Sequence, residues 1–497
     1  MIELPRKVKF IIDKLYENGF EAYAVGGCVR DVMLGRTPKD WDITTSASPV
    51  QIKNIFNKTI DTGIAHGTVT VMISGEGFEV TTYRIDGEYE DNRHPKEVIF
   101  TSNLIEDLKR RDFTINAMAY NEKDGLVDEF GGIDDLNNKV IRCVGNARDR
   151  FNEDALRIMR AARFSAQLGF DIEEETLKAM KMISGNLKNI SAERIKTEFD
   201  KLLMSSNPDR IYTMYHAGIT SVVLPEFDSI VGVAQENPNH IYDVGMHTVK
   251  SIEMLDNRSF FEQNESICGG NVTSDSEFDE TDYKNELKIL DSKIDFGALE
   301  DDKLLLALKW TMLLHDLGKP KMKTIDDKGI AHFKMHEKES EKIAANVFKR
   351  LKFDNYTADL AKWLIKWHDY RFTTTKKSIR KAVSKIGKEY FNLIMIVKRA
   401  DMLAQNPETF KEKCVNLALT IDIFNDIIAD GECLSIKELD INGKDLIDSG
   451  IKPGPLMGKL MNYLLEYVLE SPECNHKDLL VEESLKFYKS NIEHNNH

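Results

Sequence analysis

The sequence is poor in cysteine, and the cysteines it has are scattered. The 497 residues include six cysteines, with no Cys-x-x-Cys pair and no short-range framework. That spacing gives no sign of disulfides or of a zinc site built on thiolates. A reducing compartment, the cytoplasm, is therefore the expected location.

Long apolar runs are also missing. The longest strongly apolar stretch, Leu304–Leu314, is interrupted by Lys309 and reaches about half of the roughly 20 residues that a membrane-spanning helix needs. The amino terminus shows helical spacing of apolar residues with Gly19 as a stop, and it lacks the cleavage site of a signal peptide. We expect a chain outside the membrane, long enough for several domains.

Basic charge is in short supply, since 67 basic residues against 82 acidic ones give a net charge of −15. That balance argues against a nucleic-acid partner. However, residues 251–302 alone carry fifteen acidic and four basic residues, or −11, which leaves about −4 for the rest of the chain. Residues 142–163 contain six arginines against three acidic residues. The chain can therefore still present a local basic groove.

The pattern of the chain changes near residue 139. The first 135 or so residues alternate short β-rich runs with turns and helical patterns, whereas nearly every segment after Glu153 has helical periodicity. This pattern predicts an α+β fold in which an amino-terminal mixed β-sheet is followed by an all-helical region. The polar, acidic residues 257–302 are expected to form a loop or a partly disordered insertion.

The densest chemical signal is YAVGGCVRDVMLGRTPKDWDITT. Gly26 and Gly27 follow a strand and precede a helix, so the backbone can approach a phosphate there, and Arg30 supplies positive charge. Asp40 and Asp42 flank a tryptophan in a β-rich run, and alternation along a strand points both carboxylates the same way.

Two carboxylates so placed can hold two divalent ions about 3.5–4 Å apart, which is the arrangement that activates a 3′-hydroxyl and stabilises a departing pyrophosphate. A third acid is then expected on a neighbouring strand. Glu79, between Phe78 and Val80 in FEVTTYR, fits that place.

Three segments, GGCVRDVMLGRTPKDWDITT, RRDFTINAMAY and RFNEDALRIMRAARF, resemble the successive motifs of the class II tRNA nucleotidyltransferases, the CCA-adding enzymes, whose head is shared with bacterial poly(A) polymerases. The resemblance runs from about Tyr23 to Phe170, and LDINGKDLIDSGIKPGPLMGKLMNYLLEYVLE is similar to the tails of bacterial members. It implies transfer of CMP, CMP and AMP from CTP and ATP to the tRNA 3′ end, with Mg²⁺ and without a nucleic-acid template.

The resemblance also implies an organisation and a set of roles. We expect a catalytic nucleotidyltransferase head at 1–138, a helical neck and body at 139–240, a third domain at 241–405 with the acidic insertion 257–302, and a helical tail at 406–497. In the head, Asp40 and Asp42 would hold Mg²⁺ with Glu79 assisting. The residues expected to bind the nucleotide are Gly27, Arg30, Arg111, Asp154, Arg157, Arg160 and Arg163.

Selection of the base can be argued from the residues themselves. Asp154 and Arg157 lie three residues apart in a helical pattern and so share one face, with Arg160 and Arg163 continuing the row. A carboxylate beside a guanidinium offers an acceptor beside a donor. Cytosine and adenine carry an amino donor next to a ring-nitrogen acceptor, whereas uracil and guanine carry a carbonyl next to a ring N–H. Such a pair would accept C and A and reject U and G.

Two neighbouring segments also match the family. In RRDFTINAMAY the resemblance gives Arg111 a contact with the nucleotide, while Asp112 and Asn116 hold the site together. The polar segment 84–110 is similar to the flexible loop of complete CCA-adding enzymes, which favours full CCA addition. A helix with Glu193, Arg194 and Glu198 resembles the last family motif, although a purely structural ion-pair helix explains it equally well.

Histidines form a second cluster, since six of the twelve fall within 129 residues. His315 and Asp316 are adjacent at the end of an apolar helix, with His247 upstream and Asp401 downstream. This order resembles the HD phosphohydrolase superfamily, in which such a set binds a divalent metal that activates water. His336 and His368 could add ligands for a second ion.

We therefore predict a CCA-adding enzyme with an HD domain, whose partners are the tRNA 3′ end, ATP and CTP, and whose second metal is unidentified. The closest alternative is a bacterial poly(A) polymerase, which would use ATP alone. Another alternative is an HD-type RNA phosphohydrolase whose head only binds tRNA.

Overall fold

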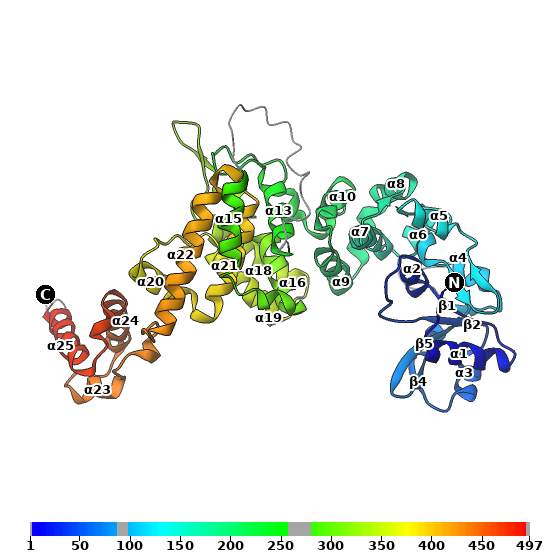
Figure 1. The fold of residues 1–497 in the computed structure, drawn as a ribbon, viewed down its shortest axis with the longest axis horizontal. Coiled ribbons are helices and arrows are strands. Elements are labelled where there is room, and N and C mark those ends of the chain that lie inside the picture. Colours follow the sequence, from blue (N-terminus) through cyan, green and yellow to red (C-terminus); the bar gives the residue numbers. More distant parts are fainter. Residues whose placement is uncertain (1, 87–97, 257–279, 494–497) are drawn as a thin grey trace. The chain divides into compact units, whose positions relative to one another are not determined.

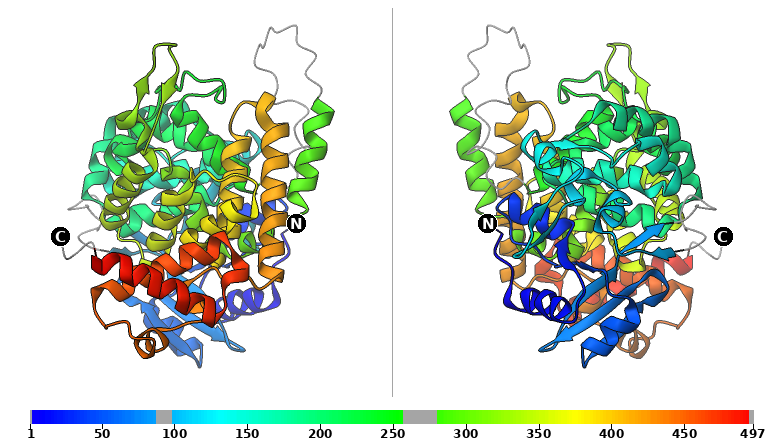
Figure 2. Two further views of the ribbon diagram at one scale, coloured as in Figure 1. Left: turned by 90° about the vertical axis from the view of Figure 1, so that its left-hand side faces the viewer. Right: turned by 90° about the vertical axis from the view of Figure 1, so that its right-hand side faces the viewer.

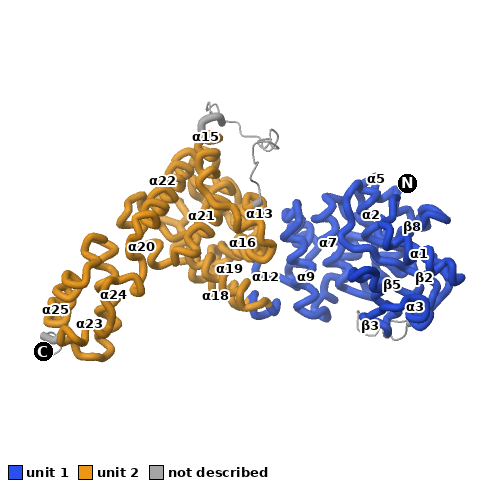
Figure 3. Tube along the Cα trace, turned by 60° about the horizontal axis from the view of Figure 1, so that its bottom comes forward, with its two compact units in different colours: residues 1–228, 347–352 blue, residues 229–346, 353–497 orange. Residues whose placement is uncertain are grey.

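The computed structural model describes residues 2–86, 98–256 and 280–493 and divides into two compact units (Figure 3). Unit 1 comprises residues 1–228 with 347–352, and unit 2 comprises residues 229–346 with 353–497. The expected loop at 84–110 falls partly outside the described residues, since 87–97 are not described. Among the described residues, no helix combines the length and the apolarity needed to span a membrane.

Unit 1 begins with a mixed sheet of seven strands in the order β3-β4-β5-β2-β1-β8-β9 (Figure 1). Strand β2 runs parallel to β5, and the other neighbouring pairs are antiparallel. The seven strands are β1 (Ala22–Val25), β2 (Ile43–Thr45), β3 (Thr59–Gly63), β4 (Thr68–Ile73), β5 (Glu76–Thr82), β8 (Ala119–Asn121) and β9 (Gly125–Val127). β6 (Arg84–Asp86) and β7 (Val98–Phe100) form a separate pair.

Helices pack against several strands of this sheet. Helix α1 (Arg6–Glu17) has the predicted apolar face, since Val8, Ile11, Ile12 and Leu15 are all buried, and it packs on β1 and α3. Gly19 follows the helix with φ of +83°, which suits glycine at a helix end. The other helices of this region are α2 (Gly27–Met33), α3 (Pro49–Ile55), α4 (Leu104–Lys109) and α5 (Gly132–Asn137).

The rest of unit 1 is helical. Its helices are α6 (Ala147–Glu153), α7 (Leu156–Leu168), α8 (Glu174–Ile183), α9 (Ala192–Leu203), α10 (Ile211–His216), α11 (Thr220–Val223) and α12 (Pro225–Asp228). Helix α7 packs on α9, and α6 packs on α8. One short parallel pair, β10 (Val140–Ile141) with β11 (Asp171–Ile172), interrupts a region expected to be entirely helical.

Unit 2 is built on helices that meet around α16. Helix α16 (Asp302–Leu314) is apolar on nearly all sides and buries its whole second half, and it packs on α13 (Val244–Asp256), α19 (Asn355–Trp367) and α21 (Lys388–Leu403). The other long helices are α15 (Glu280–Asp291), α18 (His336–Arg350), α20 (Lys376–Ile386) and α22 (Phe410–Ala429). α17 (Lys319–Met322) and the pair β12 (Thr324–Ile325) with β13 (Ala331–His332) are short.

Part of the acidic segment forms a helix, where a loop or a partly disordered insertion was expected. Residues 257–279 lie outside the described residues, but residues 280–291 form α15, which lies along α22 (Figure 2). Tyr283 and Leu287 of α15 are buried, and Asp291 receives two hydrogen bonds from the buried Arg399. Apolar burial and a buried ion pair therefore outweigh the polar composition of this segment.

The carboxyl-terminal residues form a helical subdomain of α23 (Gly443–Asp448), α24 (Pro455–Glu470) and α25 (Lys477–Glu493). Its core includes Leu446, Leu460, Leu464 and Leu480, each completely buried. The tail motif identified in the sequence thus corresponds to a packed helical element.

Candidate functional site

Two neighbouring strands bring Asp42 and Glu79 together. Asp42 directly precedes β2, and its carbonyl accepts a hydrogen bond of 3.0 Å from the amide of Val25 in β1. β2 pairs in parallel with β5, with Ile43 opposite Val80, so the residues before them, Asp42 and Glu79, are adjacent in register. The predicted third acid on a neighbouring strand is in place.

The strand that was expected to carry both aspartates is shorter than predicted. β2 begins at Ile43, so Asp40 lies two residues before Asp42 in the irregular segment that enters the strand. Both aspartates are exposed, as is Glu79, whose neighbours Phe78 and Val80 are buried on the other face of the sheet. The carboxylates therefore face solvent and are open to a ligand.

The pKa values of two of these carboxyls reflect this crowding. The pKa of Asp42 is raised by the loss of surrounding water, while nearby Arg111 opposes the shift and Asp40 adds to it. The pKa of Glu79 is raised by desolvation and by repulsion from Asp42 and Asp40. A divalent cation would relieve this repulsion, and carboxylate oxygens are the donors that Mg²⁺ takes in proteins. The donor types present therefore suit Mg²⁺, although these carboxylates are not among the three groups of described residues whose ligand atoms lie within 4.8 Å of one another.

Gly26 brings Arg111 close to the turn after β1. Gly26 has φ of +82°, and a Cβ there would lie 3.0 Å from Nη1 of Arg111. Arg111 also lies 3.4 Å from a carboxylate oxygen of Asp107, which is fully buried. Glycine at position 26 thus leaves room for the guanidinium that the sequence assigns to nucleotide binding.

Asp107 was not among the predicted site residues. Its Oδ2 accepts a hydrogen bond from the hydroxyl of Thr44, two residues after Asp42, and its Oδ1 accepts from Nε of Arg110 at 2.9 Å. Burial raises the pKa of Asp107, but Arg111 and Arg110 lower it more, so the net pKa is below its ordinary value. Asp107 thus connects β2 to the two arginines. The sequence signal that could have indicated Asp107 is its spacing, three and four residues before Arg110 and Arg111.

A chain of polar contacts connects Arg30 to the helices that follow the head. Nη1 of Arg30 donates to Oδ1 of Asn116 at 2.7 Å, and Nδ2 of Asn116 donates to Oδ1 of Asp112 at 3.1 Å. Nε of Arg160 donates to the other oxygen of Asp112 at 2.7 Å. Asp112 and Asn116 thus lie in a hydrogen-bonded chain, as the family resemblance implied. Arg160, which was expected to bind the nucleotide, is bonded to Asp112.

The expectation that Asp154 and Arg157 share one helix face is wrong. Helix α6 ends at Glu153 and α7 begins at Leu156, so Asp154 lies at the junction between them with φ of −135°. Its Oδ1 accepts a hydrogen bond from the amide of Leu156 at 3.0 Å. Aspartate commonly accepts such a bond at the start of a helix, and this preference divides the predicted helix in two.

Each of the arginines in this row has a carboxylate partner. Arg157 pairs with Glu153 at 2.6 Å rather than with Asp154, and its Nη2 donates to the carbonyl of Arg110. Arg163 is buried and pairs with Glu198 of α9 at 2.5 Å. The partner of Asp154 is a residue outside the predicted site, Arg194 of α9, at 2.9 Å. The structure thus joins two of the family-like motifs.

In unit 2, the four predicted metal ligands converge. His247 lies in α13, His315 and Asp316 follow α16 directly, and Asp401 lies in α21. Nε2 of His247 is 2.8 Å from Oδ1 of Asp401 and 3.4 Å from Oδ2 of Asp316. His247, His315 and Asp401 have ligand atoms that all lie within 4.8 Å of one another. Helices α13, α16 and α21 pack against one another. This packing brings the four residues together although the acidic insertion separates them in the sequence.

Two more histidines reach the other side of Asp316. His336 begins α18 and His368 follows α19, and their Nε2 atoms lie 3.2 and 3.9 Å from Oδ1 of Asp316. His315, Asp316 and His368 form a second set of three ligand atoms within 4.8 Å of one another. Asp316 therefore stands between two groups of imidazoles, one at each carboxylate oxygen.

Every histidine of this cluster is oriented by its own backbone contact. The Nδ1 atoms of His247, His315, His336 and His368 lie 2.6–3.1 Å from the carbonyl oxygens of Ala404, Met312, Phe333 and Ile365 respectively. An Nδ1–H that donates to a carbonyl leaves the Nε2 lone pair free, and this arrangement is typical of metal-binding histidines. All four Nε2 atoms are directed at the carboxylates.

The cluster is buried, and its polar atoms are held by ion-pair contacts rather than by well-aligned hydrogen bonds. The Lys319 ammonium lies 2.7 Å and Nε2 of His315 lies 3.2 Å from Oδ2 of Asp316, while Nε2 of His315 has no hydrogen-bond partner of good geometry among the described residues. Burial alone would lower the pKa of His315, but Asp316 and Asp401 raise it to about 10. Buried polar atoms without partners are costly. Imidazole and carboxylate donors together suit a divalent transition metal, so this donor set fits such an ion.

A cavity of about 890 Å³ opens beside the cluster. Its lining includes the metal-ligand candidates Asp316, His336, His368 and Asp401 together with Lys319, whose ammonium lies 2.7 Å from Oδ2 of Asp316. Basic and aromatic side chains also line the cavity, among them Lys334, Lys366, Arg371, Phe333 and Trp367. The cluster is therefore accessible to a small anionic molecule.

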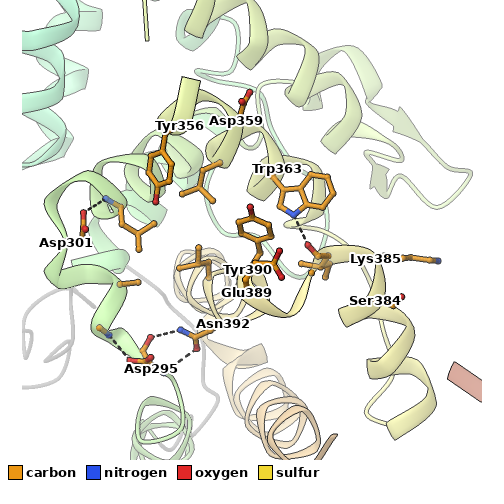
Figure 4. Close-up of a pocket in the computed structure, with 17 residues that line it drawn as sticks. Asp295, Asp301, Tyr356, Asp359, Trp363, Ser384, Lys385, Glu389, Tyr390 and Asn392 are labelled. Atoms are coloured by element: carbon orange, nitrogen blue, oxygen red, sulfur yellow. Dashed lines mark hydrogen bonds between the residues drawn. The ribbon is translucent and has the colours of Figure 1, made fainter. Parts of the chain in front are cut away.

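A larger cavity of about 1100 Å³ in unit 2 has a different character (Figure 4). The side chain of Trp363 donates to the carbonyl of Ile386 at 2.8 Å, and Asn392 is bonded to the backbone of Asp295. Asp359 and Glu389 also line it. None of the three metal-ligand groups found among the described residues includes a residue of this cavity. We assign no chemistry to it.

Family comparisons cover both units. Residues 22–142 match the "Poly A polymerase head domain", residues 169–231 match the "RNA and SrmB-binding site of polymerase A", and residues 324–483 match "tRNA nucleotidyltransferase domain 2". The first match contains the strands that carry Asp42 and Glu79.

Curated relatives resemble part of the chain. It is 54% identical over 196 residues to the CCA-adding enzyme of Leuconostoc mesenteroides, which is 39% of this chain and 49% of the relative. It is 48% identical over 234 residues to the CCA-adding enzyme of Streptococcus pyogenes, which is 46% of this chain and 56% of the relative. The matched region thus spans about half the length of each relative.

Solved structures resemble the whole chain. The CCA-adding enzyme of Bacillus stearothermophilus in complex with CTP matches with a TM-score of 0.64 and 26% identity, over 99% of this chain and 100% of that one. The CCA-adding enzyme of Thermotoga maritima, complexed with tRNA, has the same fold with a TM-score of 0.54 and 22% identity, over 97% and 96% of the two chains. These findings show that the chain has the fold of the CCA-adding enzymes and contains a region similar to the poly A polymerase head domain.

Proposed function

We propose that this chain adds CMP, CMP and AMP from CTP and ATP to the 3′ end of tRNA without a nucleic-acid template. The observation that carries the proposal is the adjacency of Asp42 and Glu79 on neighbouring strands, within a head domain that also positions Arg30 and Arg111. The CCA-adding enzymes that the chain resembles over its matched region support the same reaction.

Asp40 and Asp42 would hold Mg²⁺, with Glu79 as the third nearby carboxylate. When bound, Mg²⁺ supplies charge stabilisation for the attacking and departing oxygens. Arg111 lies near Asp42, and Arg30 lies in α2, which begins at Gly27. Both arginines carry the positive charge that a triphosphate requires. The 3′-oxygen of the tRNA forms a bond to the α-phosphorus of the nucleotide, the bond to the β-phosphate breaks, and pyrophosphate leaves.

Base selection falls to the junction between α6 and α7. The carboxylate of Asp154 accepts the exocyclic amino group that cytosine and adenine share, and a guanidinium donates to the adjacent ring nitrogen. Arg157 is the proposed donor, and Glu153 holds it close to the junction. Uracil and guanine would meet the carboxylate with a carbonyl oxygen, so they would be rejected.

Incorporation of labelled nucleotides tests this proposal. Purified full-length protein is incubated with tRNA that lacks its 3′ CCA and with each of the four nucleoside triphosphates, singly and together. We expect two cytidines followed by one adenosine. Long adenosine homopolymers made from ATP alone would instead identify a poly(A) polymerase, and no incorporation at all would contradict the proposal. We propose the cytoplasm as its location, since the described cysteines are free thiols.

A second function is proposed for unit 2, because six buried or partly buried side chains converge there. We infer that His247, His315, Asp316 and Asp401 bind a divalent cation, and that His336 and His368 extend the site to a second cation across Asp316. Bound cations would activate water toward a phosphoester. Lys319 and the basic residues of the adjoining cavity would orient the anionic substrate.

Metal content distinguishes this second function from the first. Full-length protein is loaded with Mn²⁺, Co²⁺ or Ni²⁺, dialysed and analysed by mass spectrometry of the metal, alongside the variants His315→Ala and His216→Ala. His216 lies at the end of α10, outside the cluster. We expect bound metal in the wild type and in His216→Ala and its loss in His315→Ala. Equal metal content in all three proteins would contradict the site.

A further inference from the structure

Helix α9 reaches the junction between α6 and α7 through one residue. Nη2 of Arg194 donates to Oδ2 of Asp154 at 2.9 Å, and the two side chains are 29% and 19% exposed. Arg194 lies in the first turn of α9, and α9 packs along α7. The contact joins residues that lie forty positions apart in the sequence, and it is largely shielded from solvent.

Both oxygens of Asp154 are held. The amide of Leu156 donates to Oδ1 at 3.0 Å, and Arg194 donates to Oδ2. Two donors that approach different oxygens fix the plane of the carboxylate and its rotation about the side-chain bonds. Each carboxylate oxygen has two lone-pair sites, so an exocyclic amino group can still be accepted at either one.

The other arginine at the junction does not hold Asp154. Nη1 of Arg157 donates to Glu153 and to the carbonyl of Arg150, and its Nη2 donates to the carbonyl of Arg110. Its donors are directed to the end of α6 and to the head domain. The orientation of Asp154 therefore depends on the Arg194 side chain of α9 together with the amide of Leu156.

We propose that Arg194 is a positioning residue for base selection, acting through Asp154. This inference rests on the proposed addition of C and A. Without Arg194, the carboxylate can turn away from the approaching base or pair with a nearby arginine, so that the acceptor position that distinguishes an amino group from a carbonyl is no longer fixed. Charge-assisted hydrogen bonds of this kind are strong enough to change a discrimination ratio by about tenfold or more.

The measurement is the ratio of kcat/KM for CTP to that for UTP, in the first addition to tRNA that lacks CCA. We expect Arg194→Ala to lower this ratio about tenfold or more. Arg194→Lys should recover part of the loss, since an ammonium can still donate to Oδ2. Lys196→Ala serves as the matched control, because Lys196 lies in the same helix and pairs with Asp200 at 2.6 Å, away from Asp154. Its ratio should stay within about twofold of the wild type.

A double-mutant cycle separates positioning from general damage. If Arg194 acts through Asp154, the ratio in Asp154→Asn with Arg194→Ala should equal that in Asp154→Asn alone. Independent, additive losses would overturn the proposal, and so would an unchanged ratio in Arg194→Ala. Where Arg194→Ala does not fold, as judged by its thermal transition, the cycle is run with Arg194→Gln. A wild type that incorporates no cytidine would refute the proposed function itself, which is a different outcome.

Discussion

Arg157 and Glu153 form an ion pair. The two partners lie one helical turn apart across the end of α6, with Nη1 of Arg157 at 2.6 Å from Oε2 of Glu153. The same guanidinium donates to the carbonyl of Arg110, next to Arg111. Arg157 therefore connects the junction that we propose to read the base with the segment that carries Arg111, the proposed triphosphate-binding arginine.

Replacement of Arg157 by alanine should impair both base choice and catalysis. The change removes the proposed donor to the ring nitrogen and the bond to the backbone of the head domain. We expect kcat/KM for CTP to fall and discrimination against UTP to weaken by about tenfold. Steady-state incorporation with each nucleotide measures both effects. Discrimination equal to that of the wild type would remove Arg157 from base selection.

Asp42→Asn should abolish nucleotide transfer and leave tRNA binding intact. The amide keeps the shape of the side chain but loses the charge that holds a divalent cation beside Glu79. Loss of at least about three orders of magnitude in kcat is expected, since the chemical step depends on that cation. Filter binding with labelled tRNA and incorporation assays measure the two properties separately.

The control for that variant is Asp61→Asn. Asp61 is an exposed aspartate in β3 of the same sheet that pairs with Lys53. It should transfer nucleotides at the wild-type rate, since exposed ion pairs contribute little. Transfer retained by Asp42→Asn would remove Asp42 from the metal site.

In the histidine cluster, variants on the two sides of Asp316 should differ in metal content. His315→Ala removes a ligand shared by both groups, so both ions should be lost, whereas His368→Ala leaves His247, His315 and Asp401 in place. We expect about half of the wild-type metal content in His368→Ala, measured after dialysis. Complete retention in His368→Ala would limit the site to one ion. Nucleotide incorporation should not change in either variant.

Acid should weaken unit 1 through Asp112. Burial raises the pKa of Asp112, but Arg160 and Asn116 lower it by more. The net pKa is about 2 in the folded protein, against an ordinary value of 3.8. A depressed pKa stabilises the fold above the unfolded value, and that contribution is lost as the pH falls from about 4 to about 2. The shift corresponds to about 2 kcal/mol.

Asp112→Asn should therefore be less stable than the wild type at neutral pH, with a difference that shrinks below pH 4. Urea unfolding at a series of pH values measures it. Asp134→Asn, which changes an exposed aspartate of α5, is the matched control and should show no such trend. A stability difference that does not vary with pH would assign the effect of Asp112→Asn to packing instead.

Parts of the site with local signals were predictable from the sequence. Alternation around Glu79 indicated that its neighbours face inward, and Phe78 and Val80 are buried as expected. The apolar run before His315 indicated a buried helix that ends at the proposed metal ligands, and α16 ends at Leu314. In both cases the periodicity of a single element determines where the functional side chain points.

The remaining features depend on contacts between distant segments. Asp154 fits a helical pattern, but its bond to the amide of Leu156 starts a new helix, and its partner Arg194 comes from another helix. Likewise, the acidic composition of residues 280–291 gave no sign that Asp291 would receive Arg399 across the domain. Pairings of this kind are selected by tertiary packing, which local propensity does not describe.

Three of the four histidines of the cluster, His315, His336 and His368, have their Nδ1 atoms close to the carbonyl oxygen three residues earlier, at Met312, Phe333 and Ile365 respectively. The rings are thus set by the ends of their own helices before any ion arrives. Binding of an ion then costs little side-chain freedom. Removal of the ion by a chelator would leave the imidazole rings in place. This part of the chain therefore resembles a rigid receptor for metal more than a fold that the metal assembles, and its affinity should be limited by dehydration of the ion.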